Sequence, residues 1–148
     1  MKAFLRYWLP LLIWMALIFI GSTDFMSAEH TSRIIGPFMR WLRPGISEHT
    51  IVQVQLLVRK AAHVSEYAVL AALLYRAIVH TILVGRGLVS ATVVLFLCGV
   101  YAVSDEFHQS FVPSRTASAR DVAIDSAGAL FGLLLTRKLQ REAVQSSS

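Results

Sequence analysis

The stretch Gly87–Gln109, "GLVSATVVLFLCGVYAVSDEFHQ", decides the fold class of this chain. Its first part, Gly87–Ser104, carries no charged residue and approaches the length of about 20 residues that a helix needs to cross a bilayer core. Ionisable and amide side chains then follow within a few positions. A polar group that directly follows an apolar run is typical of a membrane-spanning helix whose end lies at the edge of the membrane.

The composition of the whole chain supports this interpretation. Hydrophobic residues make up 55% of the 148 residues and charged residues only 16%, against about 25% charged in a typical soluble domain. The net charge is +5, but the basic residues flank apolar runs and form no single face, which indicates contact with anionic lipids and argues against nucleic-acid binding. The single cysteine, Cys98, excludes an internal disulfide and is predicted to be buried.

Three further apolar runs give the other spans. Tyr7–Thr23 is uncharged, whereas Ala61–Tyr75 and Val122–Thr136 are apolar apart from isolated ionisable residues. We therefore predict an all-α, polytopic membrane protein: a four-helix transmembrane bundle in a single domain, residues 1–148. The predicted spans cover about 5–22, 58–80, 87–105 and 121–137, and a polar tail follows at 140–148.

The segment between the first two spans, "TSRIIGPFMRWLRPG" at 31–45, mixes apolar and basic residues. This mixture predicts a short helix lying in the membrane interface, in which Gly36 and Pro37 would bend or interrupt the helix. An irregular loop with hydrophobic anchors fits the same pattern equally well.

Four spans place both termini on the same side of the membrane. The basic residues divide equally between the two sides, so the positive-inside rule alone gives no majority. The basic residues that flank the first and last spans favour cytoplasmic termini, namely Lys2, Arg6, Arg137, Lys138 and Arg141. We therefore predict a multi-pass protein of the cell membrane with both termini in the cytoplasm.

Helical spacing places ionisable residues on shared faces of the predicted spans. Lys60, His63 and Tyr67 are three and four positions apart, with Glu66 to one side. His63 alone would fit a single buried histidine with a satisfied hydrogen bond. Glu66 lies a turn deeper, where ionisable groups are costly and usually face partners or a cavity, so this face is predicted to turn toward the protein interior.

The last span carries a stripe of a different kind. Asp121 and Asp125 are four positions apart, and Gly128 and Gly132 continue almost the same stripe. Glycines at this spacing allow two helices to approach closely in lipid. One face of this helix therefore combines two carboxylates at its outer end with a close-packing groove further in.

The predicted topology gathers these polar residues at one outer edge of the membrane. Pro113 ends the third span, and the loop that follows presents Arg115. We predict a pocket of titratable groups there, although a purely structural ion-pair network would use the same side chains. The predicted site residues are Lys60, His63, Glu66, Asp105, Glu106, His108, Gln109, Arg115, Asp121 and Asp125.

Two stretches, "KAAHVSEYAVL" at 60–70 and "YAVSDEFHQSFVPSRTASARDVAIDSAGALFG" at 101–132, resemble the VanZ-like family of integral membrane proteins. The founding member of that family is linked to bacterial resistance to the glycopeptide teicoplanin. Ser114 stands where family members have glycine, and serine takes left-handed conformations less freely. The resemblance implies a link to resistance and names no reaction. It also implies that the signature positions are Lys60, His63, Tyr67, Asp105, Glu106, His108, Gln109, Arg115, Asp121 and Asp125.

Two classes of function fit such a pocket. An enzyme would act on the head group of an envelope lipid or peptidoglycan precursor, with His63 or His108 as general base and Lys60 and Arg115 holding an anionic group. The alternative is a non-enzymatic protein that binds such a head group, or whose charged network only holds the helix bundle together. The acidic residues and His108 would also suit a divalent metal, but none of them has the spacing of a known metal motif.

Overall fold

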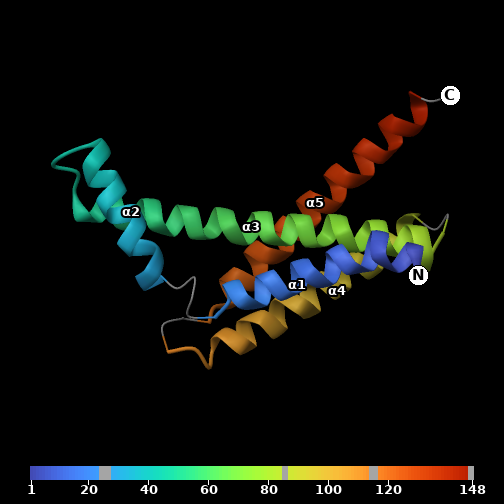
Figure 1. Ribbon diagram of the computed structural model, residues 1–148, viewed down its shortest axis with the longest axis horizontal. Coiled ribbons are helices and arrows are strands. Elements are labelled where there is room, and N and C mark those ends of the chain that lie inside the picture. Colours follow the sequence, from blue (N-terminus) through green and yellow to red (C-terminus); the bar gives the residue numbers. More distant parts are fainter. Residues whose placement is uncertain (24–27, 85–86, 114–116, 147–148) are drawn as a thin grey trace.

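The computed structural model describes residues 1–23, 28–84, 87–113 and 117–146, and the side chains of all of these except 28–31. Every regular element in these residues is helical, which confirms the predicted all-α class. A π-helical turn η1 (Phe4–Trp8) continues into α1 (Leu9–Gly21). The remaining helices are α2 (Ala28–Leu42), α3 (Glu48–Thr81), α4 (Gly87–Gln109) and α5 (Ala119–Gln145), and Figure 1 shows α5 crossing α3.

Three helical segments are long and apolar enough to cross a membrane: Phe4–Gly21, Glu48–Thr81 and Gly87–Gln109. They correspond to three of the four predicted spans. The fourth predicted span, over α5, is not long and apolar enough to meet this criterion in the described part of the chain. Charged residues lie on both sides of its apolar centre and shorten it. The four-helix transmembrane bundle therefore stays a prediction.

The segment after the first span forms a helix, which decides between the two interpretations of its sequence. α2 continues through Gly36 and Pro37, so the expected interruption does not occur. Its exposed residues Ile34, Phe38 and Trp41 are three and four positions apart and share one face. An exposed apolar stripe of this kind is the pattern of a helix that lies in a membrane interface.

α3 begins about ten residues earlier than the predicted span. Ser47 caps this start, because its Oγ accepts a hydrogen bond from the Thr50 N–H at 3.2 Å. The Arg40–Glu48 ion pair, 2.7 Å long, ties the extension to α2. With 34 residues, α3 is about 51 Å long. It is therefore longer than a bilayer core of about 30 Å and extends beyond the core.

α3 and α5 approach each other closely at two glycines. A Cβ atom on Gly128 would lie 2.5 Å from the carbonyl oxygen of Val64, and one on Gly132 would overlap the backbone of Ala68. The predicted close-packing groove is therefore confirmed. Because Gly128 and Gly132 follow Val64 and Ala68 in the same order, α3 and α5 run parallel, and their earlier residues meet at the same end.

α1 and α4 run in the opposite direction to α3. Trp8 at the start of the first helix donates a hydrogen bond to Thr81 at the end of α3, at 3.2 Å, whereas Ser22 contacts Asp105 near the end of α4. The end of α1, the end of α4 and the start of α5 therefore lie beside the first half of α3. The core between these helices includes Leu11, Ile18, Tyr67, Leu70, Leu74, Val94, Cys98, Ala102 and Leu133, which confirms the predicted burial of Cys98.

Candidate functional site

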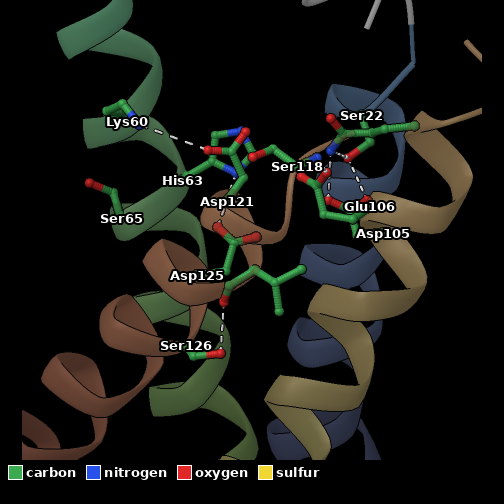
Figure 2. A network of polar contacts seen from close by, with 12 residues as sticks. Ser22, Lys60, His63, Ser65, Asp105, Glu106, Ser118, Asp121, Asp125 and Ser126 are labelled. Carbon is green, nitrogen blue, oxygen red and sulfur yellow. Dashed lines mark hydrogen bonds and ion pairs between the residues drawn. The ribbon is translucent and has the colours of Figure 1, made fainter. Parts of the chain in front are cut away.

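His63 of α3 and Asp125 of α5 form the centre of a polar cluster, shown in Figure 2. Nδ1 of His63 lies 3.0 Å from Oδ1 of Asp125. The side chain of Asp125 is fully buried, and 13% of the His63 side chain is exposed. When Asp125 is ionised, it can only accept a hydrogen bond, so Nδ1 of His63 carries the hydrogen in that state and Nε2 remains for another partner. The pair lies immediately before the glycine contact, which sets the spacing of the two helices.

Lys60 and Asp121 meet about one turn before His63 and Asp125, toward the starts of α3 and α5. Nζ of Lys60 lies 3.9 Å from Oδ1 of Asp121, and the two side chains are 51% and 23% exposed. Exposure along this face of α3 falls from Lys60 through His63 to Tyr67, which is fully buried. The predicted polar face therefore leads from the surface into the core.

A pocket with a volume of about 330 Å³ opens between the first half of α3 and the start of α5. We call it the rim pocket. Arginine and lysine side chains outnumber the single carboxylate in its lining, so the pocket is net positive. Its lining residues are Leu56, Arg59, Lys60, His63, Ser118, Arg120 and Asp121.

Asp105 and Gln109 belong to a separate group that joins α1 to α4. The Ser22 hydroxyl donates to Oδ1 of Asp105 at 2.5 Å, and the Gln109 side-chain amide donates to Oδ2 of Asp105 at 3.1 Å. All three side chains are buried. Both oxygens of Asp105 are thus occupied, which gives this carboxylate a role in helix packing.

Replacing Ser22 by alanine is expected to lower the free energy of unfolding by about 1–3 kcal/mol, because Oδ1 of buried Asp105 then loses its hydrogen-bond donor. Thermal unfolding of the purified protein in a mild detergent, followed by circular dichroism, measures this. Ser126→Ala is the matched control, since the Ser126 hydroxyl is exposed and bonds only within its own helix. Equal losses in the two variants would contradict the assignment.

Glu106 orients the start of α5. Its Oε2 accepts a hydrogen bond from the Ser118 N–H at 2.7 Å, and the Ser118 hydroxyl accepts one from the Arg120 N–H at 3.2 Å. This capped turn directs Asp121 and Asp125 toward α3. The sequence interpretation did not select Ser118 or Ser22. The pattern Ser118-x-x-Asp121 is a helix-start signal in the sequence and could have identified Ser118. No comparable signal in the sequence points to Ser22.

Four carboxylates lie in or behind the lining of the rim pocket, close enough to interact electrostatically with one another or with His63. Several buried polar atoms in this region have no hydrogen-bond partner among the described residues. Buried polar atoms are normally paired, so the interior of the cluster has spare capacity to bind a polar group. The carboxylates are Asp105, Glu106, Asp121 and Asp125, and the unpaired atoms are Tyr67 Oη, Glu106 Oε1, His108 Nε2 and Asp125 Oδ2.

Three other predicted site residues, His108, Glu66 and Arg115, are not part of the His63–Asp125 pair or of the Lys60–Asp121 pair. His108 packs against α1, where its ring stacks on Phe19 with centroids 4.4 Å apart. Glu66 interacts electrostatically with His63, and its backbone carbonyl accepts a hydrogen bond from Trp14 at 2.9 Å. Arg115 lies outside the described residues. The structure therefore joins His63 to the carboxylates of α4 and α5, with Lys60 at the entrance.

The described residues contain no group of three histidine, cysteine or acidic side chains arranged to hold a metal ion. His63 and Asp125 are engaged with each other, Asp105 with Ser22, and Glu106 with the backbone of Ser118. A divalent metal, considered from the sequence, therefore finds no fitting set of donors in this part of the chain.

No curated protein and no solved structure matches the chain. The model of the VanZ/LLP1 family matches residues 7–140, and this range includes the first helix, the polar cluster and most of α5. The match covers nearly the whole chain, and the helices it spans are those that carry the cluster. The chain therefore belongs to the VanZ/LLP1 family.

Proposed function

We propose that the chain binds the phosphate-bearing head group of an envelope lipid or lipid-linked peptidoglycan precursor in the rim pocket. The observation that carries this proposal is the combination of Arg59, Lys60 and Arg120 with His63 in one pocket, beside the start of the apolar run of α3 at Ala61. Guanidinium groups offer paired donors that suit phosphate oxygens, and lysine adds a point charge. The net positive lining favours an anionic ligand over a zwitterionic one.

The depth of the rim pocket supports a lipid as the ligand. Arg59 and Lys60 immediately precede the apolar run that begins at Ala61, so the basic side chains lie at the level of lipid head groups when α3 crosses the membrane. Leu56 also lines the pocket and presents an apolar surface beside the charges. A head group would enter from the side of the bilayer while its chains remain in the hydrocarbon.

The proposed orientation places the rim pocket at the outer leaflet. Both chain termini lie toward the opposite end of the molecule from this pocket, as Figure 1 shows for the N and C labels. With these termini in the cytoplasm, the pocket faces the side on which cell-wall precursors are used and glycopeptides act. A link to teicoplanin resistance would then arise from binding or altering such a precursor.

An enzymatic role is the second candidate, and the His63–Asp125 pair is the observation that favours it. Asp125 holds Nδ1, so Nε2 is free to accept a proton from a hydroxyl or to donate one to a phosphate oxygen. His63 lines the rim pocket and therefore stands beside a bound head group. The reaction class would be proton transfer at that head group, and the other carboxylates would serve to position the helices.

Replacing Lys60 or Arg120 by glutamine is expected to weaken binding of a lipid phosphate about tenfold, the effect of losing one charge-assisted hydrogen bond of about 1.5 kcal/mol. The measurement is a titration of the protein in neutral detergent with dihexanoyl phosphatidic acid, using dihexanoyl phosphatidylcholine as the comparison ligand. Arg43→Gln is the control, because Arg43 is exposed and lies outside the lining of the rim pocket.

Three results would contradict the proposal. Equal affinity for the two lipids would show that the charge of the phosphate is not recognised. An equal loss in Arg43→Gln would indicate attraction by net charge without a defined site. Unchanged binding in both Lys60→Gln and Arg120→Gln would leave the cluster with a structural role in holding the bundle together.

A further inference from the structure

A second pocket lies at the other end of the α3–α5 pair, and the proposed function does not use it. Its volume is about 610 Å³, and it lies between the end of α3, the start of α4 and the C-terminal part of α5. We call it the opposite pocket. The lining residues that carry the argument are Tyr75, Val79, Gly87, Arg137, Gln140 and Arg141.

The lining of the opposite pocket suits an anion. Arg137 and Arg141 are four positions apart on α5, so both guanidinium groups project from the same face of the helix. None of the described residues that line this pocket is acidic. The nearby Glu142 is paired with Lys138 at 3.8 Å and contributes nothing to the lining.

Tyr75 supplies an independent indication of a ligand. This residue is only 5% exposed and lines the pocket. Its hydroxyl lies 3.6 Å from the position that a Cβ atom on Gly87 would take. Gly87 is the first residue of α4, where the positive end of the helix dipole lies. The hydroxyl of a largely buried tyrosine, two arginines and a helix start thus line one pocket.

The distance between the two pockets matches the thickness of a membrane. From His63 to Val79, α3 rises about 24 Å, and from Asp121 to Arg141, α5 rises about 30 Å. The hydrocarbon core of a bilayer is about 30 Å thick. The opposite pocket therefore lies at the head-group level of the other leaflet when α3 crosses the membrane.

We propose that the opposite pocket binds the phosphate group of an anionic ligand, which is recognised by Arg137, Arg141 and the Tyr75 hydroxyl. A phosphodiester of a membrane lipid and a free phosphate ion share this chemistry. The inference is independent of the rim pocket, because the two linings have no residue in common.

The test uses the full chain in neutral detergent and a background of Lys60→Gln with Arg120→Gln, which removes two positive charges from the rim pocket. The probes are dihexanoyl phosphatidylglycerol and inorganic phosphate. Arg141→Gln is expected to weaken binding of phosphatidylglycerol about tenfold. Tyr75→Phe removes one hydroxyl without a change of charge and is expected to weaken binding about threefold. Arg76→Gln, the matched control, removes an exposed charge outside the pocket and is expected to have no effect.

Two outcomes would overturn the proposal: no measurable binding of either probe, or a loss in Arg76→Gln equal to that in Arg141→Gln. Two outcomes would support it and identify the source of the phosphate. Displacement of phosphatidylglycerol by millimolar inorganic phosphate indicates a soluble phosphate. Binding that inorganic phosphate does not displace indicates a lipid. A negative result here would not contradict the proposal for the rim pocket, because that proposal is tested with different variants.

Discussion

Replacing Gly132 by alanine is expected to destabilise the protein by about 3 kcal/mol, the upper part of the range for an overpacked contact. The added methyl group would overlap the carbonyl and Cα of Ala68 on α3, which are backbone atoms and cannot move by a simple rotation of a side chain. The two helices must separate, and the separation also draws Asp125 away from His63. We therefore expect lower thermal stability in detergent and loss of lipid-phosphate binding in the same variant.

Gly99→Ala is the matched control for this prediction. Gly99 lies in the middle of α4, and a Cβ atom there would meet no atom within 4 Å. Because alanine favours a helix over glycine, this variant is expected to keep or slightly raise the stability. Gly128→Ala tests the same contact one turn earlier, against the carbonyl of Val64. A Gly132→Ala protein as stable as Gly99→Ala would show that α3 and α5 do not depend on this close approach.

Features that depend on local spacing were predictable from the sequence. The stripe of Asp121, Asp125, Gly128 and Gly132 follows from helix geometry alone, and the structure places its glycines against α3. The same reasoning placed Lys60, His63 and Tyr67 on a face that runs from the surface to the core. Periodicity within one helix is enough for such predictions, because neighbouring positions set each other's orientation.

Features that depend on distant partners were not predictable. Ser22 and Asp105 are 83 positions apart, and only the packing of the end of α1 against the end of α4 brings them together. His108 shares a helical face with Asp105, yet the neighbouring α1 supplies Phe19, and the imidazole stacks there. The polar start of α3 was missed because hydropathy describes the apolar part of a helix and not the capped extension before it. Tertiary partners decide the first two of these cases.

Replacing Asp125 by asparagine is expected to change the tautomer of His63 while leaving the shape of the site almost unchanged. The carboxylate can only accept, so it requires the hydrogen on Nδ1 and leaves Nε2 for the rim pocket. An asparagine amide can donate to Nδ1 instead, which moves the hydrogen to Nε2. Nε2 of His63 then carries a hydrogen and no longer accepts a proton from a bound head group.

Nitrogen-15 NMR of the histidine-labelled protein in detergent measures this change directly, with the His63→Gln variant used to assign the signals. In the unmodified protein we expect a protonated Nδ1 at His63, and in Asp125→Asn a neutral ring protonated at Nε2. Asp121→Asn provides the contrast: Asp121 pairs with Lys60 and not with His63, so the tautomer should persist and the more positive rim should bind the phosphate no less tightly. A His63 ring with the same tautomer in all three proteins would show that Asp125 does not control it, and the case for acid–base chemistry in this pocket would fail, whatever the affinity for lipid phosphate.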